Sequence, residues 1–196
     1  MKIDANGTEI TVIGKENMPK EAALYVGNHR SYFDILILYV QCENLTGFVA
    51  KDAIEKVPSL RVWMRYLYCL FLNRSDAREG LKTILTAIEY VKKGISICIF
   101  PEGTRSKTGE MASLKAGSFK MATRAKAKVV PVVLKNTRQC LEDAHYFGIV
   151  PVYVQILPAI ETEDMSPEEM QELPMRVETM LREAYEKLPS FPKKKN

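Results

Sequence analysis

The chain has 196 residues, of which 46% are hydrophobic and 27% charged, and its formal net charge is +4. This fits one globular domain with a sizeable core, and the mild positive charge allows an anionic partner without requiring one. No apolar stretch approaches the roughly 18 residues of a membrane span, and residues 1–14 are too polar for a signal peptide. The four cysteines form no C-x-x-C pair, so we expect free thiols in a reducing cytosol.

Hydrophobic periodicity predicts strands and helices that alternate along the chain. The expected strands are residues 8–13, 22–27, 45–50, 69–73, 95–100, 129–134 and 150–157, and the expected helices are residues 32–40, 58–68, 76–93, 118–126 and 167–188. Ser75 or Asp76 caps the long third helix, which ends at Gly94, and Ser166 opens the last helix with a capping box. The alternation predicts an α/β fold in a single domain over residues 1–196, with a mostly parallel or mixed central sheet and helices on both faces.

A histidine and an aspartate follow the second expected strand. On one continuous helix, His29 and Asp34 would point in different directions. Ser31 is a good N-cap, however, and would begin the helix after His29 and place Asp34 in its first turn, within reach of the imidazole. Such a contact fixes the tautomer and favours the protonated ring, which makes a general-base dyad without a nucleophile. The alternative is that Asp34 only caps the helix and that His29 is an ordinary turn residue.

Basic side chains follow three other expected strands. Lys51 comes after the third strand, Arg74 after the fourth, and Arg105 lies in the loop after the fifth. Because the carboxyl ends of parallel strands share one edge, where ligands of such folds bind, these cations should lie near the dyad. Guanidinium and ammonium groups beside the N–H groups of a glycine-containing loop suit a phosphate. The alternative for each cation taken singly is a solvated surface residue.

Several segments resemble the motifs of the glycerolipid acyltransferases. They are Asn28 to Asp34 (H-x-x-x-x-D), Phe100 to Ser106 (F-P-E-G-T-R-S), Phe71 to Arg74 (the end of G-x-x-F-x-x-R), Val130 to Val133 (a proline-containing strand) and Phe48 to Lys51 (a lysine-bearing strand end). The first two, in this order and about seventy residues apart, are highly specific. Tyr68 stands where the glycine of the third motif is expected. The likeness covers residues 12–157 and is closest to the bacterial lysophosphatidic acid acyltransferases, which implies a glycerol-phosphate acyltransferase-like fold.

The resemblance implies an enzyme of phospholipid biosynthesis, and we expect it to use no metal or other cofactor. It would move a fatty acyl group from a thioester donor, acyl-CoA or acyl carrier protein, to the free hydroxyl of lysophosphatidic acid, giving phosphatidic acid. His29 would take the proton from that hydroxyl, and Asp34 would hold the imidazole and stabilise its cationic form.

The remaining site residues follow from the same resemblance. Arg105 and Lys51 would bind the substrate phosphate, with Arg74 as a helper. The loop that holds Glu102, Gly103 and Thr104 would contact the substrate. Glu102 would accept a hydrogen bond from a substrate hydroxyl or from neighbouring basic side chains, and Gly103 would allow close backbone approach.

Other functions stay open at this point. The acceptor could be glycerol 3-phosphate or another lysolipid. A hydrolase could use the same base without a phosphate site, and a lipid-binding module would need no chemistry. His145 lies in no group with metal-ligand spacing, and basic residues interspersed with acids, without an aromatic platform, disfavour nucleic acid.

The segment 58–71 has an interfacial pattern, in which aromatic residues alternate with basic ones: Arg61, Trp63, Arg65, Tyr66 and Tyr68. The alternative is a core helix with two surface arginines. Most members of the family carry a hydrophobic or amphipathic helical segment before the first strand, and Met1 here lies close to that strand. We expect the protein at the cytoplasmic face of the plasma membrane, either docked peripherally or anchored by an N-terminal segment that this sequence does not include, and favour the second.

Overall fold

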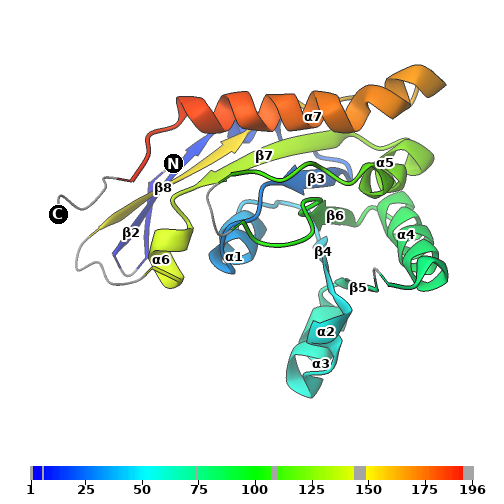
Figure 1. Ribbon diagram of the computed structural model, residues 1–196, viewed down its shortest axis with the longest axis horizontal. Coiled ribbons are helices and arrows are strands. Elements are labelled where there is room, and N and C mark those ends of the chain that lie inside the picture. The colour runs from blue at the N-terminus through cyan, green and yellow to red at the C-terminus, as the bar shows by residue number, and fades with distance from the viewer. Residues whose placement is uncertain (1, 6, 74, 107–109, 144–148, 192–196) are drawn as a thin grey trace.

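The computed structural model describes residues 2–5, 7–73, 75–106, 110–143 and 149–191 (Figure 1). Its strands are β1 (Lys2–Ala5), β2 (Thr8–Ile13), β3 (Leu24–Gly27), β4 (Thr46–Lys51), β5 (Leu70–Leu72), β6 (Ser96–Ile99), β7 (Val129–Lys135) and β8 (Val150–Ile156). Its α-helices are α1 (Phe33–Tyr39), α2 (Asp52–Glu55), α3 (Pro58–Tyr66), α4 (Ala77–Lys92), α5 (Lys120–Ala125), α6 (Arg138–Leu141) and α7 (Pro167–Lys187). Its short 3-10 helices are η1 (Lys15–Asn17) and η2 (Ala116–Phe119).

The strands form one mixed sheet in the order β1-β2-β8-β7-β3-β6-β4-β5. The neighbours from β7 through β3, β6 and β4 to β5 are parallel. Strand β8 runs antiparallel to β7 and parallel to β2, and β1 closes that edge antiparallel to β2. The predicted α/β fold is therefore confirmed. The sequence did not indicate β1, α2 or α6, each of which is only four residues long and lacks a periodic pattern.

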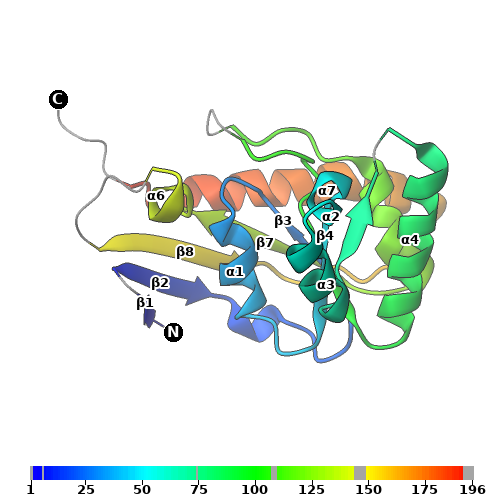
Figure 2. The ribbon, with the colours of Figure 1, turned by 90° about the horizontal axis from the view of Figure 1, so that it is seen from below.

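Helices cover both faces of the sheet. On one face, Ala87 of α4, Met121 of α5 and Val177 of α7 belong to one buried cluster. On the other face, Leu38 of α1 packs in a second cluster with Tyr25 of β3. Figures 1 and 2 show α7 on one side of the sheet and α1 on the other. Every residue of β3 and β6 is buried, as expected for central strands with both faces covered.

The predicted helix boundaries have the expected caps. Asp76 is the N-cap of α4, and its side chain accepts hydrogen bonds from the N–H groups of Arg78 and Glu79. Gly94, just past the end of α4, has φ 86°, a conformation that glycine adopts without strain. Ser166 forms the predicted capping box at the start of α7.

The C-terminal end of α7 is fixed to the sheet. The buried Lys135, which ends β7, donates hydrogen bonds from Nζ to the carbonyl oxygens of Tyr185 at 2.8 Å and Leu188 at 2.7 Å. Burial, and secondarily the positive charge of Arg30, lowers the pKa of Lys135. Arg30 also donates from Nη1 to the hydroxyl of Tyr185. The turn after β3, the end of β7 and the last helix are thus joined through polar contacts.

The pair formed by α2 and α3 projects from the sheet on the side that carries α1 (Figures 1 and 2). No residue of either helix is buried, and Met64 packs partly against the core on that side. The structure therefore does not support a core helix at 58–66. Across the described part of the chain, no helix is both long and apolar enough to cross a bilayer.

Tyr68, at the place of the motif glycine, has a left-handed backbone conformation with φ 57°. Residues with a side chain rarely adopt it. The segment crosses β4 closely, because a Cβ atom on Gly47 would collide with the carbonyl group of Tyr68. The Tyr68 ring packs edge-on against Tyr90 with 5.3 Å between ring centroids. This position has the backbone that favours glycine, and an aromatic contact offsets part of the cost.

We expect Tyr68→Gly to be more stable than Tyr68→Ala by about 1 kcal/mol, because both lose the ring but only alanine keeps a Cβ in the left-handed region. Urea unfolding of the two variants measures the difference. Equal stabilities, or a more stable alanine variant, would show that the backbone conformation at this position carries no strain.

Candidate functional site

The connection between β3 and α1 brings His29 and Asp34 into contact. Nδ1 of His29 lies 2.9 Å from Oδ2 of Asp34. The same oxygen accepts the backbone N–H groups of Arg30 at 2.6 Å and Ser31 at 2.8 Å. The Asp34 side chain is fully buried, and that of His29 is 15% exposed. One carboxylate oxygen therefore holds both the imidazole and the turn that leads into the helix. The predicted contact is present, and its catalytic role stays a prediction.

An aromatic ring supports the imidazole from the side. The ring of His29 stacks on Phe100 with 4.2 Å between centroids and 13° between planes. Gly27 makes this possible, since a Cβ there would lie 2.8 Å from Cε1 of Phe100. The hydrogen bond to Asp34 and the stacking together fix both the position and the plane of the ring.

Glu102 joins the loop after β6 to the turn that carries His29. Its carboxylate is buried, and its two oxygens accept the backbone N–H groups of His29 at 2.7 Å and Ala112 at 3.0 Å. Burial raises the pKa of Glu102, although both hydrogen bonds act in the opposite direction. Each oxygen of Glu102 thus holds one backbone N–H group, and the expected hydrogen bond from a substrate hydroxyl or a basic side chain stays a prediction. The neighbouring Gly103 turns the loop with φ 85°.

The loop after β6 also brings Arg105 beside the dyad. The N–H group of Ser106 donates to the carbonyl oxygen of His29 at 2.9 Å. The guanidinium group of Arg105 lies over the Tyr32 ring, 3.7 Å from its centroid. Thr104 is exposed. The two most specific segments of the sequence, far apart along the chain, therefore meet at one edge of the sheet.

Sequence reasoning missed one acidic residue of this site, Glu142, which follows α6. Its Oε1 accepts hydrogen bonds from Nη1 of Arg105 at 2.9 Å and from the N–H group of Tyr32 at 3.1 Å. Its Oε2 accepts from the hydroxyl of Ser31 at 2.6 Å. Burial acts to raise the pKa of Glu142, but these hydrogen bonds outweigh it, and the pKa is lowered. No motif or periodic pattern in the sequence marked this residue.

The other two predicted phosphate ligands are less informative. Lys51 is exposed at the carboxyl end of β4, and its ammonium group forms no ion pair with the residues that the structure describes. Arg74 lies outside the described residues, as does His145. The placement of Lys51 at a strand end agrees with the sequence, and its role stays a prediction.

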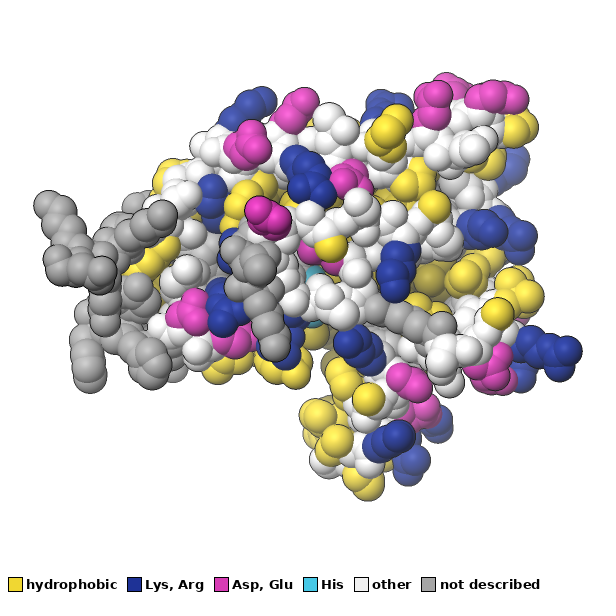
Figure 3. Space-filling view, in the orientation of Figure 1, with side chains coloured by type: hydrophobic (Ala, Val, Ile, Leu, Met, Phe, Trp, Pro, Cys, Tyr) yellow, Lys and Arg dark blue, Asp and Glu magenta, His cyan; other side chains and the backbone are white. Residues whose placement is uncertain are grey.

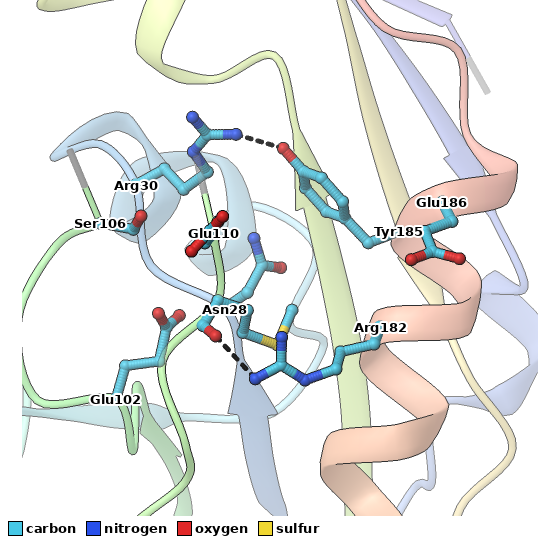
Figure 4. Close-up of a pocket in the computed structure, with 9 residues that line it drawn as sticks. Asn28, Arg30, Glu102, Ser106, Glu110, Arg182, Tyr185 and Glu186 are labelled. Carbon is cyan, nitrogen blue, oxygen red and sulfur yellow. Dashed lines mark hydrogen bonds between the residues drawn. The ribbon is translucent and has the colours of Figure 1, made fainter. Parts of the chain in front are cut away.

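A cavity of about 580 Å³ lies on the α7 side of the same turn (Figure 4). Its lining residues are Asn28, Arg30, Glu102, Ser106, Glu110, Met111, Arg182, Tyr185 and Glu186. The charged groups in it are largely paired within the protein. Arg182 donates to the carbonyl oxygen of Met111 at 2.6 Å and to Glu178 at 2.8 Å, and Arg30 contacts Tyr185. Asp34 belongs to α1, and Phe100, on which His29 stacks, packs in the cluster on the α1 face of the sheet.

Comparison with known proteins agrees with this site. The sequence profile of the family described as Acyltransferase matches residues 9–135. This chain belongs to that family. The matched range holds the dyad, the Arg105 loop and Lys51, and it ends before Glu142 and α7.

Its relatives include proteins named 1-acyl-sn-glycerol-3-phosphate acyltransferase. One from Saccharomyces cerevisiae is 33% identical over 87% of this chain and 58% of its own length. One from Borreliella burgdorferi is 31% identical over 85% of this chain and 68% of its own length. The crystal structure of the 1-acyl-sn-glycerophosphate (LPA) acyltransferase PlsC from Thermotoga maritima is 29% identical, with a TM-score of 0.78, over 94% of this chain and 74% of that one. The chain thus spans between 58% and 74% of the length of these proteins.

We expect Glu102→Gln to lower the free energy of unfolding by about 1–3 kcal/mol, because the amide nitrogen would face a buried backbone N–H donor. The exposed Glu89→Gln is the matched control, and its free energy of unfolding should change little.

Because the pKa of Glu102 is raised in the folded state, this carboxyl stabilises the fold below its unfolded pKa and loses that contribution as the pH rises through the folded pKa. The stability gap between wild type and Glu102→Gln should therefore widen on acidification. A gap that narrows would show that the carboxylate is the form the fold prefers.

Proposed function

We propose that this chain is the catalytic part of a lysophosphatidic acid acyltransferase. It would move a fatty acyl group from the thioester of acyl-CoA or acyl carrier protein to the free hydroxyl of lysophosphatidic acid, giving phosphatidic acid. The observation that supports this most is the buried Asp34–His29 contact beside the loop of Arg105, in a chain whose relatives carry this activity in their names.

The proposed chemistry is general-base catalysis of a direct transfer. Asp34 binds Nδ1 of His29, which leaves Nε2 to take the proton of the acceptor hydroxyl. The hydroxyl oxygen then attacks the thioester carbonyl, and the tetrahedral intermediate collapses by breaking the carbon–sulfur bond. The proton on His29 passes to the leaving thiolate, and the imidazole returns to its neutral state. Asp34 stabilises the cationic ring that exists between these steps.

The phosphate of the acceptor would bind the basic groups at the same edge. Arg105 is followed in its loop by Ser106, whose N–H group binds the carbonyl oxygen of His29. A phosphate bound by the Arg105 guanidinium group would therefore hold the acceptor near the base. Lys51 and Arg74 are the further proposed ligands.

An anionic bilayer would be the surface on which the amphiphilic substrate is met. We define the docking face by five exposed apolar side chains on α1 and α3 and at the C-cap of α1: Leu36, Val40, Leu60, Trp63 and Tyr66. Trp63 is 70% and Tyr66 77% exposed, and Arg61 and Arg65 are exposed on the same helix. Both helices lie in front of the sheet in Figure 2, and Figure 3 shows hydrophobic side chains gathered on the projecting pair. Aromatic rings beside basic groups suit the interface of an anionic membrane.

An acyl-transfer assay with acyl-CoA and acyl carrier protein donors tests the chemistry. We expect His29→Ala to lower kcat with lysophosphatidic acid and with uncharged monoacylglycerol alike, by at least about a hundredfold, because the base acts on the hydroxyl of either acceptor. We expect Arg105→Ala to raise KM about tenfold or more for lysophosphatidic acid and little for monoacylglycerol, because only the former presents a phosphate.

The chain offers matched controls for both substitutions. His145→Ala changes the second histidine of the sequence, outside the family motifs, and should leave the rate near that of wild type. Arg124→Ala removes an exposed arginine from α5 and should leave both acceptors unaffected. Full activity in His29→Ala would refute the base, and equal losses on the two acceptors in Arg105→Ala would refute the phosphate site.

Sedimentation with phosphatidylglycerol-containing vesicles tests the docking face. We expect the double variant Trp63→Ser, Tyr66→Ser to bind vesicles about tenfold more weakly, because it loses interfacial apolar area. The matched control is Leu81→Ser with Leu85→Ser, which removes two exposed leucines from α4 and should bind like wild type. Equal vesicle binding by both double variants would show that α3 does not meet the membrane.

A further inference from the structure

Glu142 is paired with Arg105, the residue proposed above to bind the substrate phosphate. Its carboxylate accepts a guanidinium N–H of Arg105, the hydroxyl of Ser31 and the backbone N–H of Tyr32, at 2.9, 2.6 and 3.1 Å. These donors come from the two segments that flank His29 in the fold. A charged group, a hydroxyl and an amide directed at one anion form the kind of donor set that binds phosphate.

The same carboxylate opposes a second anion. The side chain of Glu142 is 18% exposed and that of Arg105 33% exposed, so the charges are only partly screened by water. A phosphate placed on Arg105 while Glu142 stayed in position would put two negative groups within a few ångströms of one another, which costs free energy. A monoester phosphate carries more negative charge than a carboxylate and has three acceptor oxygens. It can therefore take over all the donors that Glu142 holds.

We propose, on the basis of the proposed function, that the Glu142 carboxylate fills the phosphate site when no substrate is bound. The phosphate of the acceptor must then displace this carboxylate. Glu142 then acts as a specificity-determining residue. In the absence of a phosphate it neutralises Arg105 and holds the turn of Ser31 and Tyr32. A headgroup that lacks strong negative charge does not exchange with it and gains nothing from Arg105.

The position of Glu142 is compatible with such an exchange. It follows the four-residue helix α6, which contacts α1 and contains no buried residue. The next residue, Asp143, is paired with a different arginine, Arg138, at 2.9 and 3.0 Å. Two adjacent acids thus have separate partners, and this provides a control of equal charge on the same segment.

The test compares Glu142→Gln with Asp143→Asn. We expect Glu142→Gln to lower KM for lysophosphatidic acid about tenfold, by removing a like charge near the phosphate, with KM for monoacylglycerol unchanged. Asp143→Asn, which removes the same charge one residue away, should change KM much less. In the Arg105→Ala background, Glu142→Gln should give no gain, because the two residues act through one contact.

A KM for lysophosphatidic acid that is unchanged or higher in Glu142→Gln would overturn the proposal and make Glu142 a support for Arg105. An equal decrease of this KM in Asp143→Asn would also overturn the proposal. So would a decrease of this KM that Glu142→Gln still produces in the Arg105→Ala background. Glu142→Ala is a second variant, and melting temperatures identify any variant that does not fold.

Equilibrium binding separates this inference from the proposed function. If wild type transfers no acyl group to lysophosphatidic acid, the proposed function fails, but calorimetry with lysophosphatidic acid below its micelle concentration still decides the role of Glu142. Tighter binding by Glu142→Gln than by wild type supports displacement, and equal or weaker binding refutes it.

Discussion

The carboxylate of Glu102 joins the turn after β3 to the loop after β6 by accepting the N–H groups of His29 and Ala112. Both segments lie at the carboxyl ends of central parallel strands, whose register is fixed by the sheet. Because the loop also donates from Ser106 to the carbonyl oxygen of His29, the histidine backbone is held on both its N–H and its C=O group. This double connection holds the backbone of His29 against the loop that carries Arg105.

Glu102 and Glu142 have different surroundings, and their pKa values are shifted in opposite directions. Glu102 is buried among backbone groups, and its pKa is raised. Glu142 has hydrogen bonds from a guanidinium group, a hydroxyl and a backbone N–H, and its pKa is lowered. Another anion can replace the Glu142 carboxylate on these donors, whereas Glu102, which is enclosed by backbone donors, cannot move without loosening the turn. Glu102 therefore suits a structural role, and Glu142 suits a position where a substrate phosphate can replace it.

Sequence patterns predicted the contacts between residues that lie close together along the chain. Ser31 and Asp34 lie within one helical turn of each other, so the return of the carboxylate to His29 could be inferred from capping rules alone. The contact between Ser31 and Glu142 spans 111 residues of sequence and depends on how α6 packs on α1, which no local pattern encodes. The role of Glu102 was missed for the same reason, since its partners are backbone groups of separate segments. Whether α3 is a core or a surface helix also depends on tertiary packing, because its apolar arc fits either.

The placement of β8 and α7 has a consequence for where this polypeptide can be divided. Strand β8 sits between β2 and β7, so it connects an early strand to the centre of the sheet. Lys135, the last residue of the range matched by the family profile, reaches across to carbonyl oxygens near the end of α7. A fragment of residues 9–135 would lack β8, which pairs with β2, and α7, which covers one face of the sheet. The buried ammonium group of Lys135 would also lose both of its carbonyl partners. The range matched by the family profile is therefore shorter than the set of elements that completes the sheet and buries Lys135.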